Sequence, residues 1–142
     1  MKKVIQVVVI GVIKKGNKYL LTRRIHDNEI YHDKWQLPGG GLEFGEDVQD
    51  ALRRELKEEL DIEVEVVRLL PKIYHDVRTN WHGILLGFLC GMKDEHAKII
   101  LDTEASAYQW YTKEEVKSLN CLRYTYELIV EAEKQLNLKV TV

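Results

Sequence analysis

The chain has 142 residues, of which 45% are hydrophobic, and a formal net charge of −2. This length and apolar content predict a single folded domain spanning residues 1–142 and argue against global disorder. The nearly balanced charge lacks the clustered lysine and arginine excess of duplex-binding proteins, so we expect no nucleic-acid partner. A small anionic ligand is still compatible, because it needs only a few local cations.

Cysteine usage and hydropathy predict a cytoplasmic protein. Cys90 and Cys121 show no paired spacing, so we expect neither a disulfide framework nor a zinc site, and a reducing compartment is the default. The apolar run after Lys3 is rich in valine and isoleucine and ends at Lys14 without a small-residue cleavage site. It therefore favours a strand over a signal peptide. No stretch reaches the roughly 18 apolar residues of a membrane span, so we expect no membrane partner.

The first half of the chain predicts two strands, a loop and a helix. In chain order we expect a strand over 4–14, a hairpin turn at Gly16-Asn17, a strand over 19–24, a polar loop over 25–34, a short extended segment over 35–37, a glycine turn, and a helix from 46 or 47 to 60. Acidic residues open this helix, which suits the positive end of its dipole.

The second half predicts more strands and two further helices. We expect strands over 62–70, 73–77, 84–92 and 108–111, a polar loop over 78–82, a helix from 113 capped by Thr112, and a helix over about 122–135. The strand over 84–92 is strongly apolar and is expected to be central. Mixed strands with a few helices indicate an α+β or α/β fold, with helices packed on the faces of a sheet.

The segment "KWQLPGGGLEFGEDVQDALRRELKEELDI" (residues 34–62) places Glu55, Glu58 and Glu59 within two helical turns. A helix advances about 100° per residue, so Glu55 and Glu59 share the arc that carries the leucines, whereas Glu58 lies on its edge and Arg54 on the solvent face. A buried carboxylate is costly unless it is protonated or faces positive charge. A divalent cation such as Mg²⁺, which prefers oxygen ligands, would provide that charge. The position of Glu55 and Glu59 on the leucine arc argues against the alternative, a charged helix whose glutamates are all solvated.

These residues resemble the Nudix box of the MutT/Nudix hydrolase family, which reads Gly, five residues, Glu, seven residues, Arg-Glu-aliphatic-x-Glu-Glu-x-Gly-aliphatic. Here the match starts at Gly40 and Glu46 and continues from Arg54 to Ile62. Asp61 replaces the family glycine at a site where we expect a left-handed backbone, which aspartate tolerates better than most residues. The flanking "YLLTRR" and "WQLPGGGLEFGE" resemble MutT-like nucleoside triphosphate hydrolases, so the resemblance covers about residues 4–62.

The resemblance implies a Nudix-type α/β/α sandwich with a mixed central β-sheet. It implies hydrolysis of a nucleoside diphosphate linked to a group X, by attack of water on phosphorus, with Mg²⁺ or alternatively Mn²⁺ as cofactor. The implied partner is a small-molecule nucleotide substrate. A homodimer is left open, because many relatives are dimers but no surface stripe in this sequence indicates one.

Carried over position by position, the resemblance assigns roles to individual residues. The implied metal ligands are Glu55, Glu58 and Glu59, with the Gly40 carbonyl and Glu104 as additional candidates. Arg54 is expected to orient a catalytic glutamate through an ion pair, and Glu46 to brace the start of the helix. The general base is either a box glutamate or Glu104. The expected substrate contacts are Arg24, Gly39, Gly40 and Asn120, and Trp81 is an undecided candidate for base stacking.

Several functions remain compatible with the box. The first is a nucleoside triphosphate pyrophosphohydrolase that releases a nucleoside monophosphate and pyrophosphate, and the "LEFGE" context favours it. The second is a pyrophosphatase of ADP-ribose or a nucleotide sugar. The third is a Nudix-fold ligand sensor without catalysis, which is disfavoured because all the box glutamates are present. The loops over 25–34 and 75–82 are expected to select the substrate.

Overall fold

The computed structural model describes residues 2–137, which form an eight-stranded sheet and three helices. The expected domain of residues 1–142 includes residue 1 and residues 138–142, which lie outside the described part. The elements are β1 (Val4–Lys15), β2 (Lys18–Arg24), β3 (Trp35–Gln36), β4 (Gly39–Gly41), α1 (Val48–Leu60), β5 (Val64–Leu69), β6 (Tyr74–Val77), β7 (Trp81–Met92), β8 (Ala105–Thr112), α2 (Lys113–Lys117) and α3 (Thr125–Leu136).

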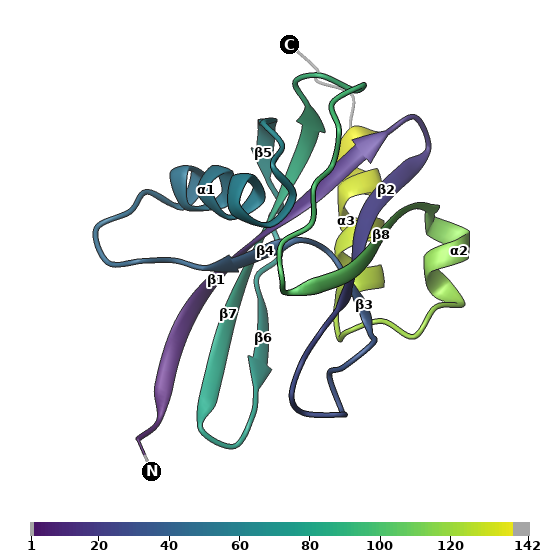
Figure 1. The fold of residues 1–142 in the computed structure, drawn as a ribbon. Coiled ribbons are helices and arrows are strands. Elements are labelled where there is room, and N and C mark those ends of the chain that lie inside the picture. Colours follow the sequence, from purple (N-terminus) through teal and green to yellow (C-terminus); the bar gives the residue numbers. More distant parts are fainter. Residues whose placement is uncertain (1, 138–142) are drawn as a thin grey trace.

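The sheet is mixed, as expected, because β1 and β7 run parallel while every other described pair is antiparallel. Its main path runs β3-β2-β1-β7-β5, with β4 added beside β1, β6 beside β7 and β8 beside β2. The strand β7 is central, which confirms the expectation from its apolar sequence. In the view of Figure 1, the lower halves of β1 and β7, together with β6, extend below α1.

Helices cover both faces of the sheet, which confirms the expected sandwich (Figure 1). Successive side chains of a strand point to opposite faces, so neighbouring residues of β1 belong to different cores. Ile13 packs in the cluster that contains Leu52 and Leu56 of α1. Val12 packs in the cluster that contains Leu128 and Ile129 of α3.

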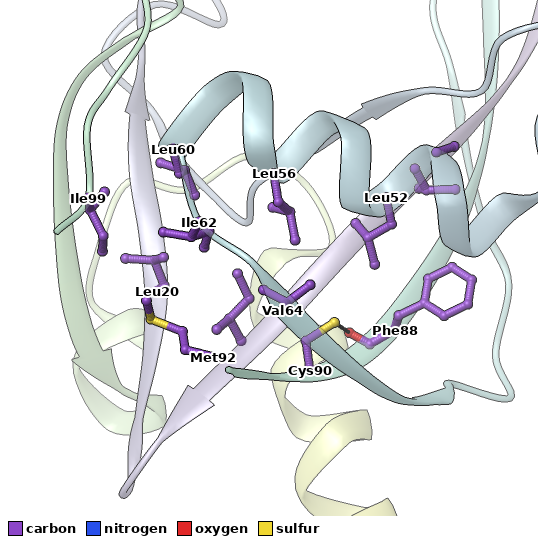
Figure 2. Close-up of a cluster of buried hydrophobic side chains, with 13 residues drawn as sticks. Leu20, Leu52, Leu56, Leu60, Ile62, Val64, Phe88, Cys90, Met92 and Ile99 are labelled. Atoms are coloured by element: carbon purple, nitrogen blue, oxygen red, sulfur yellow. Dashed lines mark hydrogen bonds between the residues drawn. The ribbon is translucent and has the colours of Figure 1, made fainter. Parts of the chain in front are cut away.

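The helix α1 buries the arc that its periodicity predicts. Its buried residues are Ala51, Leu52, Leu56 and Leu60. Figure 2 shows the three leucines directed from the helix toward Val64, Phe88 and Cys90 of the strands. The helix begins at Val48, just after the predicted start, because Asp47 is its N-cap and accepts a hydrogen bond from the backbone N–H of Gln49 at 2.9 Å.

Four elements differ from the sequence-based expectations by more than the one or two residues by which other boundaries shift. The glycine run forms the short strand β4 rather than only a turn, because its backbone pairs with Val8–Ile10 of β1. The strand β7 starts at Trp81, inside the expected loop, because β1 provides a parallel partner down to Val4. The strand β8 is longer than expected because it pairs with the whole of β2. The helix α3 starts only at Thr125, because Tyr124 has a left-handed backbone with φ of 74°.

The end of α1 confirms the expected left-handed residue. Asp61 has φ of 54° and ψ of 39°, and its N–H donates to the carbonyl of Lys57. Its carboxylate also pairs with the Lys57 ammonium at 3.0 Å on the exposed surface. Such an exposed i,i+4 pair contributes only about 0.3–0.5 kcal/mol, so backbone strain dominates at this position.

We therefore expect Asp61→Gly to raise the free energy of unfolding by about 0.5–1 kcal/mol, because glycine adopts the left-handed conformation without a Cβ penalty. Urea unfolding measures this change. Asp61→Asn is the matched control, since it removes the charge but keeps the tolerance for this conformation. A less stable Asp61→Gly protein would show that the ion pair outweighs the backbone strain.

Candidate active site

The glycine strand β4 makes room for the carboxylate of Glu55. A Cβ atom at Gly40 would lie 2.4 Å from the carboxyl carbon of Glu55, far inside van der Waals contact. A Cβ at Gly39 would lie 2.0 Å from the carbonyl oxygen of Val9. The two glycines therefore allow α1 and β1 to approach β4 closely, and they place a carboxylate against exposed backbone at the edge of the sheet.

Arg54 connects the helix to the loop that precedes it. Its Nε and Nη2 donate to the two carboxylate oxygens of Glu46 at 2.7 and 2.8 Å, a bidentate geometry. Its Nη2 also donates to the carbonyl of Gly41 at 3.1 Å. This bonding holds the pKa of Glu46 at about 2, and the backbone N–H of Glu43 adds to the effect. Glu46 thus braces the helix start, as expected.

The same guanidinium also holds the box glutamates. Arg54 Nη1 donates to Glu55 Oε1 at 2.9 Å and to Glu58 Oε2 at 3.3 Å. The Arg54 side chain is only 23% exposed, so the expectation that it lies on the solvent face is wrong. The helical phase alone does not account for Glu46, Glu55 and Glu58, which bind the guanidinium of this long side chain close to the helix. The expected ion pair between Arg54 and a box glutamate is present.

Glu59 is the most perturbed carboxyl group of the site. Its pKa is raised to about 9, mainly by burial and also by the nearby negative charges of Glu55, Glu104 and Asp102. Burial also raises the pKa of Glu55, although Arg54 opposes that change. The two side chains that the helical phase placed toward the core are therefore the two whose ionisation is most costly.

Glu104 reaches this cluster because the loop after β7 is bonded to the end of α1. The N–H of Asp102 donates to the carbonyl of Glu59, and the N–H of Ile100 to that of Leu60, both at 3.0 Å. The carbonyl of Glu104 accepts from the N–H of Ile25 at 2.9 Å. Glu104 thus lies between the helix end and the loop that follows Arg24.

A cavity of about 610 Å³ opens on the face of the sheet that α3 covers, and it extends to the carboxylate cluster. The structure brings these predicted site residues to its wall: Arg24, Gly39, Gly40, Glu55, Glu59, Trp81 and Glu104. Three other predicted residues do not line it. Arg54 acts from behind Glu55, and Glu58 has a 58% exposed side chain. Asn120 is exposed, and its carbonyl accepts from the N–H of Trp35.

Arg24 is the cation of the cavity wall that the sequence predicted. Its Nη1 donates to Gln36 Oε1 at 3.2 Å, and no ion pair to Arg24 is present among residues 2–137. Burial lowers its pKa, and the positive charge of Arg78 lowers it further, although Glu104 and Glu59 oppose that change. A half-buried guanidinium facing the cavity without a carboxylate partner favours an anionic ligand.

The wall also contains seven polar residues that were not among the predicted site residues: Gln6, His26, Gln36, Asp76, Arg78, Arg123 and Thr125. Gln6 had a detectable signal, because it is the only polar residue in the apolar run over 4–13. Asp76 and Arg78 lie in the segment over 75–82 that was expected to select the substrate, but no pattern singled them out, because their placement depends on how β6 pairs with β7. Arg78 Nη2 donates to Asp76 Oδ2 at 3.1 Å.

The acidic cluster suits a divalent cation by its chemistry. Within residues 2–137 no three acidic, histidine or cysteine side chains converge tightly enough to form a finished metal centre. The carboxylates of Glu55, Glu59 and Glu104 nevertheless interact strongly enough to raise the pKa of Glu59. A hard cation with oxygen ligands would relieve that repulsion, so these residues fit such a group.

The chain matches the NUDIX domain over residues 2–129 and belongs to the Nudix family. Nudix hydrolases generally use divalent cations. The nucleoside triphosphatase NudI of Escherichia coli (strain SE11) is 30% identical to it, over 93% of this chain and 94% of that protein. The family resemblance of the box is thereby confirmed.

No helix of residues 2–137 has the length and apolar character needed to cross a membrane.

Solved structures share the fold. The MutT protein from Methanosarcina mazei Go1 has a TM-score of 0.81 and 21% identity, covering 97% of this chain and 99% of that one. An ADP-ribose pyrophosphatase from Streptococcus suis has a TM-score of 0.71 and 18% identity, covering 95% of this chain and 94% of that one. The expected Nudix-type sandwich is therefore confirmed.

We expect Gly40→Ala to displace Glu55 and to lower the free energy of unfolding by about 1–3 kcal/mol, because the added Cβ overlaps a carboxylate and not an open space. Urea unfolding measures the change. Gly91→Ala is the matched control, because no atom lies within 4 Å of a Cβ at Gly91. Equal stability of the two variants would contradict the close approach of β4 and Glu55.

Glu59 predicts a pH dependence of stability in metal-free protein. Its pKa is raised from 4.5 to about 9 in the folded state, so between these values the folded state holds the proton more tightly than the unfolded state. The stabilisation is complete below pH 4.5 and is lost as the pH rises toward 9. We expect the Tm of chelator-treated protein to fall over this range, and Glu59→Gln to reduce the fall.

Glu58→Gln is the control for this measurement, because it makes the same side-chain replacement at an exposed position of the same helix. An unchanged pH profile in the Glu59→Gln protein would contradict the placement of a protonated Glu59 in the folded state.

Proposed function

We propose that the protein is a Mg²⁺-dependent nucleoside triphosphate pyrophosphohydrolase, built as one Nudix domain over residues 1–142, that releases a nucleoside monophosphate and pyrophosphate. The observation that carries the proposal is the meeting of Glu55, Glu59 and Glu104 at one end of a cavity of about 610 Å³. The similarity to a nucleoside triphosphatase over nearly the full length of both chains supports the choice of substrate class.

The acidic end of the cavity would hold the cation. Glu55, Glu58 and Glu59 are the proposed ligands, with the Gly40 carbonyl and Glu104 beside them. A bound Mg²⁺ or Mn²⁺ would neutralise phosphate charge and lower the pKa of water at the site. Arg54 positions Glu55 by the 2.9 Å bond to its carboxylate, and it holds Glu58 near the same guanidinium.

The remaining residues bind the nucleotide and move a proton. Arg24 donates its guanidinium N–H groups to substrate phosphate from the wall of the cavity, which it lines together with Glu104. Gly39 and Gly40 present their backbone to the same ligand. Glu59 or Glu104 accepts the proton of the attacking water, because each is a carboxyl group at this end of the cavity. Most of the catalytic effect then comes from positioning and charge neutralisation.

A substrate panel with Mg²⁺ tests the proposal. Canonical and oxidised nucleoside triphosphates are compared with ADP-ribose and nucleotide sugars, and the products are identified. Pyrophosphate and a nucleoside monophosphate from a triphosphate are expected. Cleavage of ADP-ribose or a sugar nucleotide alone would replace the substrate class while keeping the catalytic residues. Tight binding of one ligand without turnover would instead indicate a sensor.

We expect Glu58→Gln to lower kcat by at least about 100-fold without changing the Tm by more than a few degrees, because it removes a proposed cation ligand on an exposed position. A chelator should abolish the activity of the wild-type protein, and added Mg²⁺ should restore it. Glu65→Gln, an exposed change on β5, is the control. Wild-type turnover by the Glu58→Gln protein would show that Glu58 does not hold the cation.

A further inference from the structure

The hairpin of β6 and β7 brings two histidine rings together. Nδ1 of His75 lies 2.9 Å from Nε2 of His82. The ring centroids are 5.2 Å apart, and the ring planes are inclined at 63°. The strand register explains this approach, because His75 pairs with Ile84 and His82 pairs with Val77. The two histidines are therefore diagonal neighbours on adjacent strands, a position from which aromatic side chains reach each other.

Both rings lie on the face of the sheet opposite to the cavity. Asp76 follows His75 on β6 and pairs with Gly83 of β7, which pairs in turn with Gln6 of β1. Asp76 and Gln6 line the cavity, whereas His75 and His82 do not. Successive residues of a strand point to opposite faces, so the residues on either side of this row point away from the cavity. The histidine pair is therefore a feature separate from the cavity and its acidic cluster.

This part of the opposite face is open to solvent. The lower halves of β1 and β7, with β6, extend below α1 in the view of Figure 1. Ile5 and Val77, the two cross-strand partners of His82, are 70% and 64% exposed. The His75 residue is itself exposed, and His82 is half-buried. An ion in solution can therefore reach the two rings.

The rings of this pair are used differently from those of the other neighbouring histidines in the fold. In the loop over 25–34, Nδ1 of His26 accepts from the N–H of Asn28, and Nδ1 of His32 accepts from the N–H of His26. Those rings hold the backbone of their own loop. Among residues 2–137, by contrast, the only hydrogen bond of the His75 and His82 rings is the one between them. The pair thus presents two imidazole nitrogens at one point of the surface.

We propose that His75 and His82 form a binding site for a divalent transition-metal ion of the Zn²⁺, Ni²⁺ or Cu²⁺ class. Imidazole is the commonest protein ligand of such ions, and it binds them as the neutral ring. Two Zn–N bonds of about 2.1 Å in a tetrahedral arrangement place their nitrogens about 3.4 Å apart. The present separation of 2.9 Å needs to open by only about 0.5 Å to reach that value, which rotation of the exposed His75 ring can provide.

The chain supplies two ligands, and water completes the coordination of the ion. Within residues 2–137 no group of three histidine, cysteine or acidic side chains converges, so the site is open. Metal bonds replace the hydrogen bond between the rings. Coordination through His75 Nδ1 puts the ring proton on its Nε2, and coordination through His82 Nε2 puts it on its Nδ1. One ring therefore changes tautomer, and a neutral pair loses no proton. Mg²⁺ does not suit the site, because it prefers oxygen ligands.

The site goes beyond the proposed hydrolysis, because neither ring lines the cavity. The bound ion joins β6 to β7 instead. Only the folded chain brings these strands together, so binding stabilises the folded state.

Titration of metal-free protein with Zn²⁺, followed through the ring nitrogen signals of its histidines by NMR, tests the proposal. A large excess of Mg²⁺ occupies the acidic cluster, whose carboxylates also bind divalent cations. We expect the signals of His75 Nδ1 and His82 Nε2 to shift together. Their common half-shift concentration of Zn²⁺ should be at least about tenfold lower than that of His96, because two linked ligands bind more tightly than one. His96 is an exposed histidine in the turn after β7. Mg²⁺ alone should shift neither ring of the pair.

Two single variants distinguish chelation from independent binding by two surface rings. A chelate needs both rings, so His82→Gln should raise the half-shift concentration of His75 at least about tenfold, and His75→Gln should do the same for His82. His96→Gln is the matched control, because it removes one exposed histidine outside the pair, and it should leave both values unchanged. Thermal unfolding without Zn²⁺ checks that the three variants fold like the wild type.

A His75 signal that responds at the same Zn²⁺ concentration with and without His82 would overturn the proposal, because the rings would then bind independently. Wild-type rings that respond no earlier than His96 would also overturn it, since only adventitious binding would remain. Neither outcome bears on triphosphate hydrolysis, which the substrate panel tests separately.

Discussion

The energetic constraint at the centre of this structure is the placement of two carboxylates on the core-facing arc of α1. Glu55 and Glu59 share that arc with the leucines that hold the helix on the sheet, so the carboxylates cannot leave without unpacking the helix. Burial raises the pKa of both groups, and the negative charge of Glu58 adds to this for Glu55, as that of Glu55 does for Glu59. Much of the surrounding structure compensates for this arrangement, through Arg54 on one side and the oxygen-rich cluster open to a cation on the other.

The all-glycine strand β4 provides the space that the Glu55 carboxylate occupies beside α1. A conventional strand would fill the space beside α1 with side chains, whereas Gly40 leaves it to the Glu55 carboxylate. The same strand joins the acidic cluster to the cavity, because all three of its residues line the wall. The cavity then changes character along β1, from carboxylates and Arg24 at one end to Gln6, Trp81 and Asp76 at the other.

Local periodicity predicted what depends on a single element. The 3.6-residue period placed Glu55 and Glu59 on the buried arc. The family glycine that Asp61 replaces after the helix indicated a left-handed backbone there, and its φ is 54°. Pairing between strands could not be predicted this way. The row of Gln6, Gly83 and Asp76 exists only because of the register of β1, β7 and β6, and no short-range pattern encodes that register.

The positions of long side chains were the second feature that local sequence patterns could not predict. The helical phase placed the Cβ of Arg54 toward solvent, but its guanidinium lies several bonds further on and follows Glu46 and Glu55. Likewise, Asn120 follows the end of α2 in sequence, yet the backbone keeps it on the surface and brings Leu122 and Arg123 to the cavity instead.

Proton release on binding Mg²⁺ tests the arrangement of the acidic cluster most directly. A Glu59 with a pKa of about 9 holds a proton at pH 7, and a cation that binds its carboxylate must displace it. Calorimetric titration with Mg²⁺ in buffers of different ionisation enthalpy measures this number without any substrate. Release of about one proton per bound cation at pH 7, abolished in Glu59→Gln, is the predicted result. Binding without proton release would show that the cation does not use Glu59, and the cluster would then have a different role.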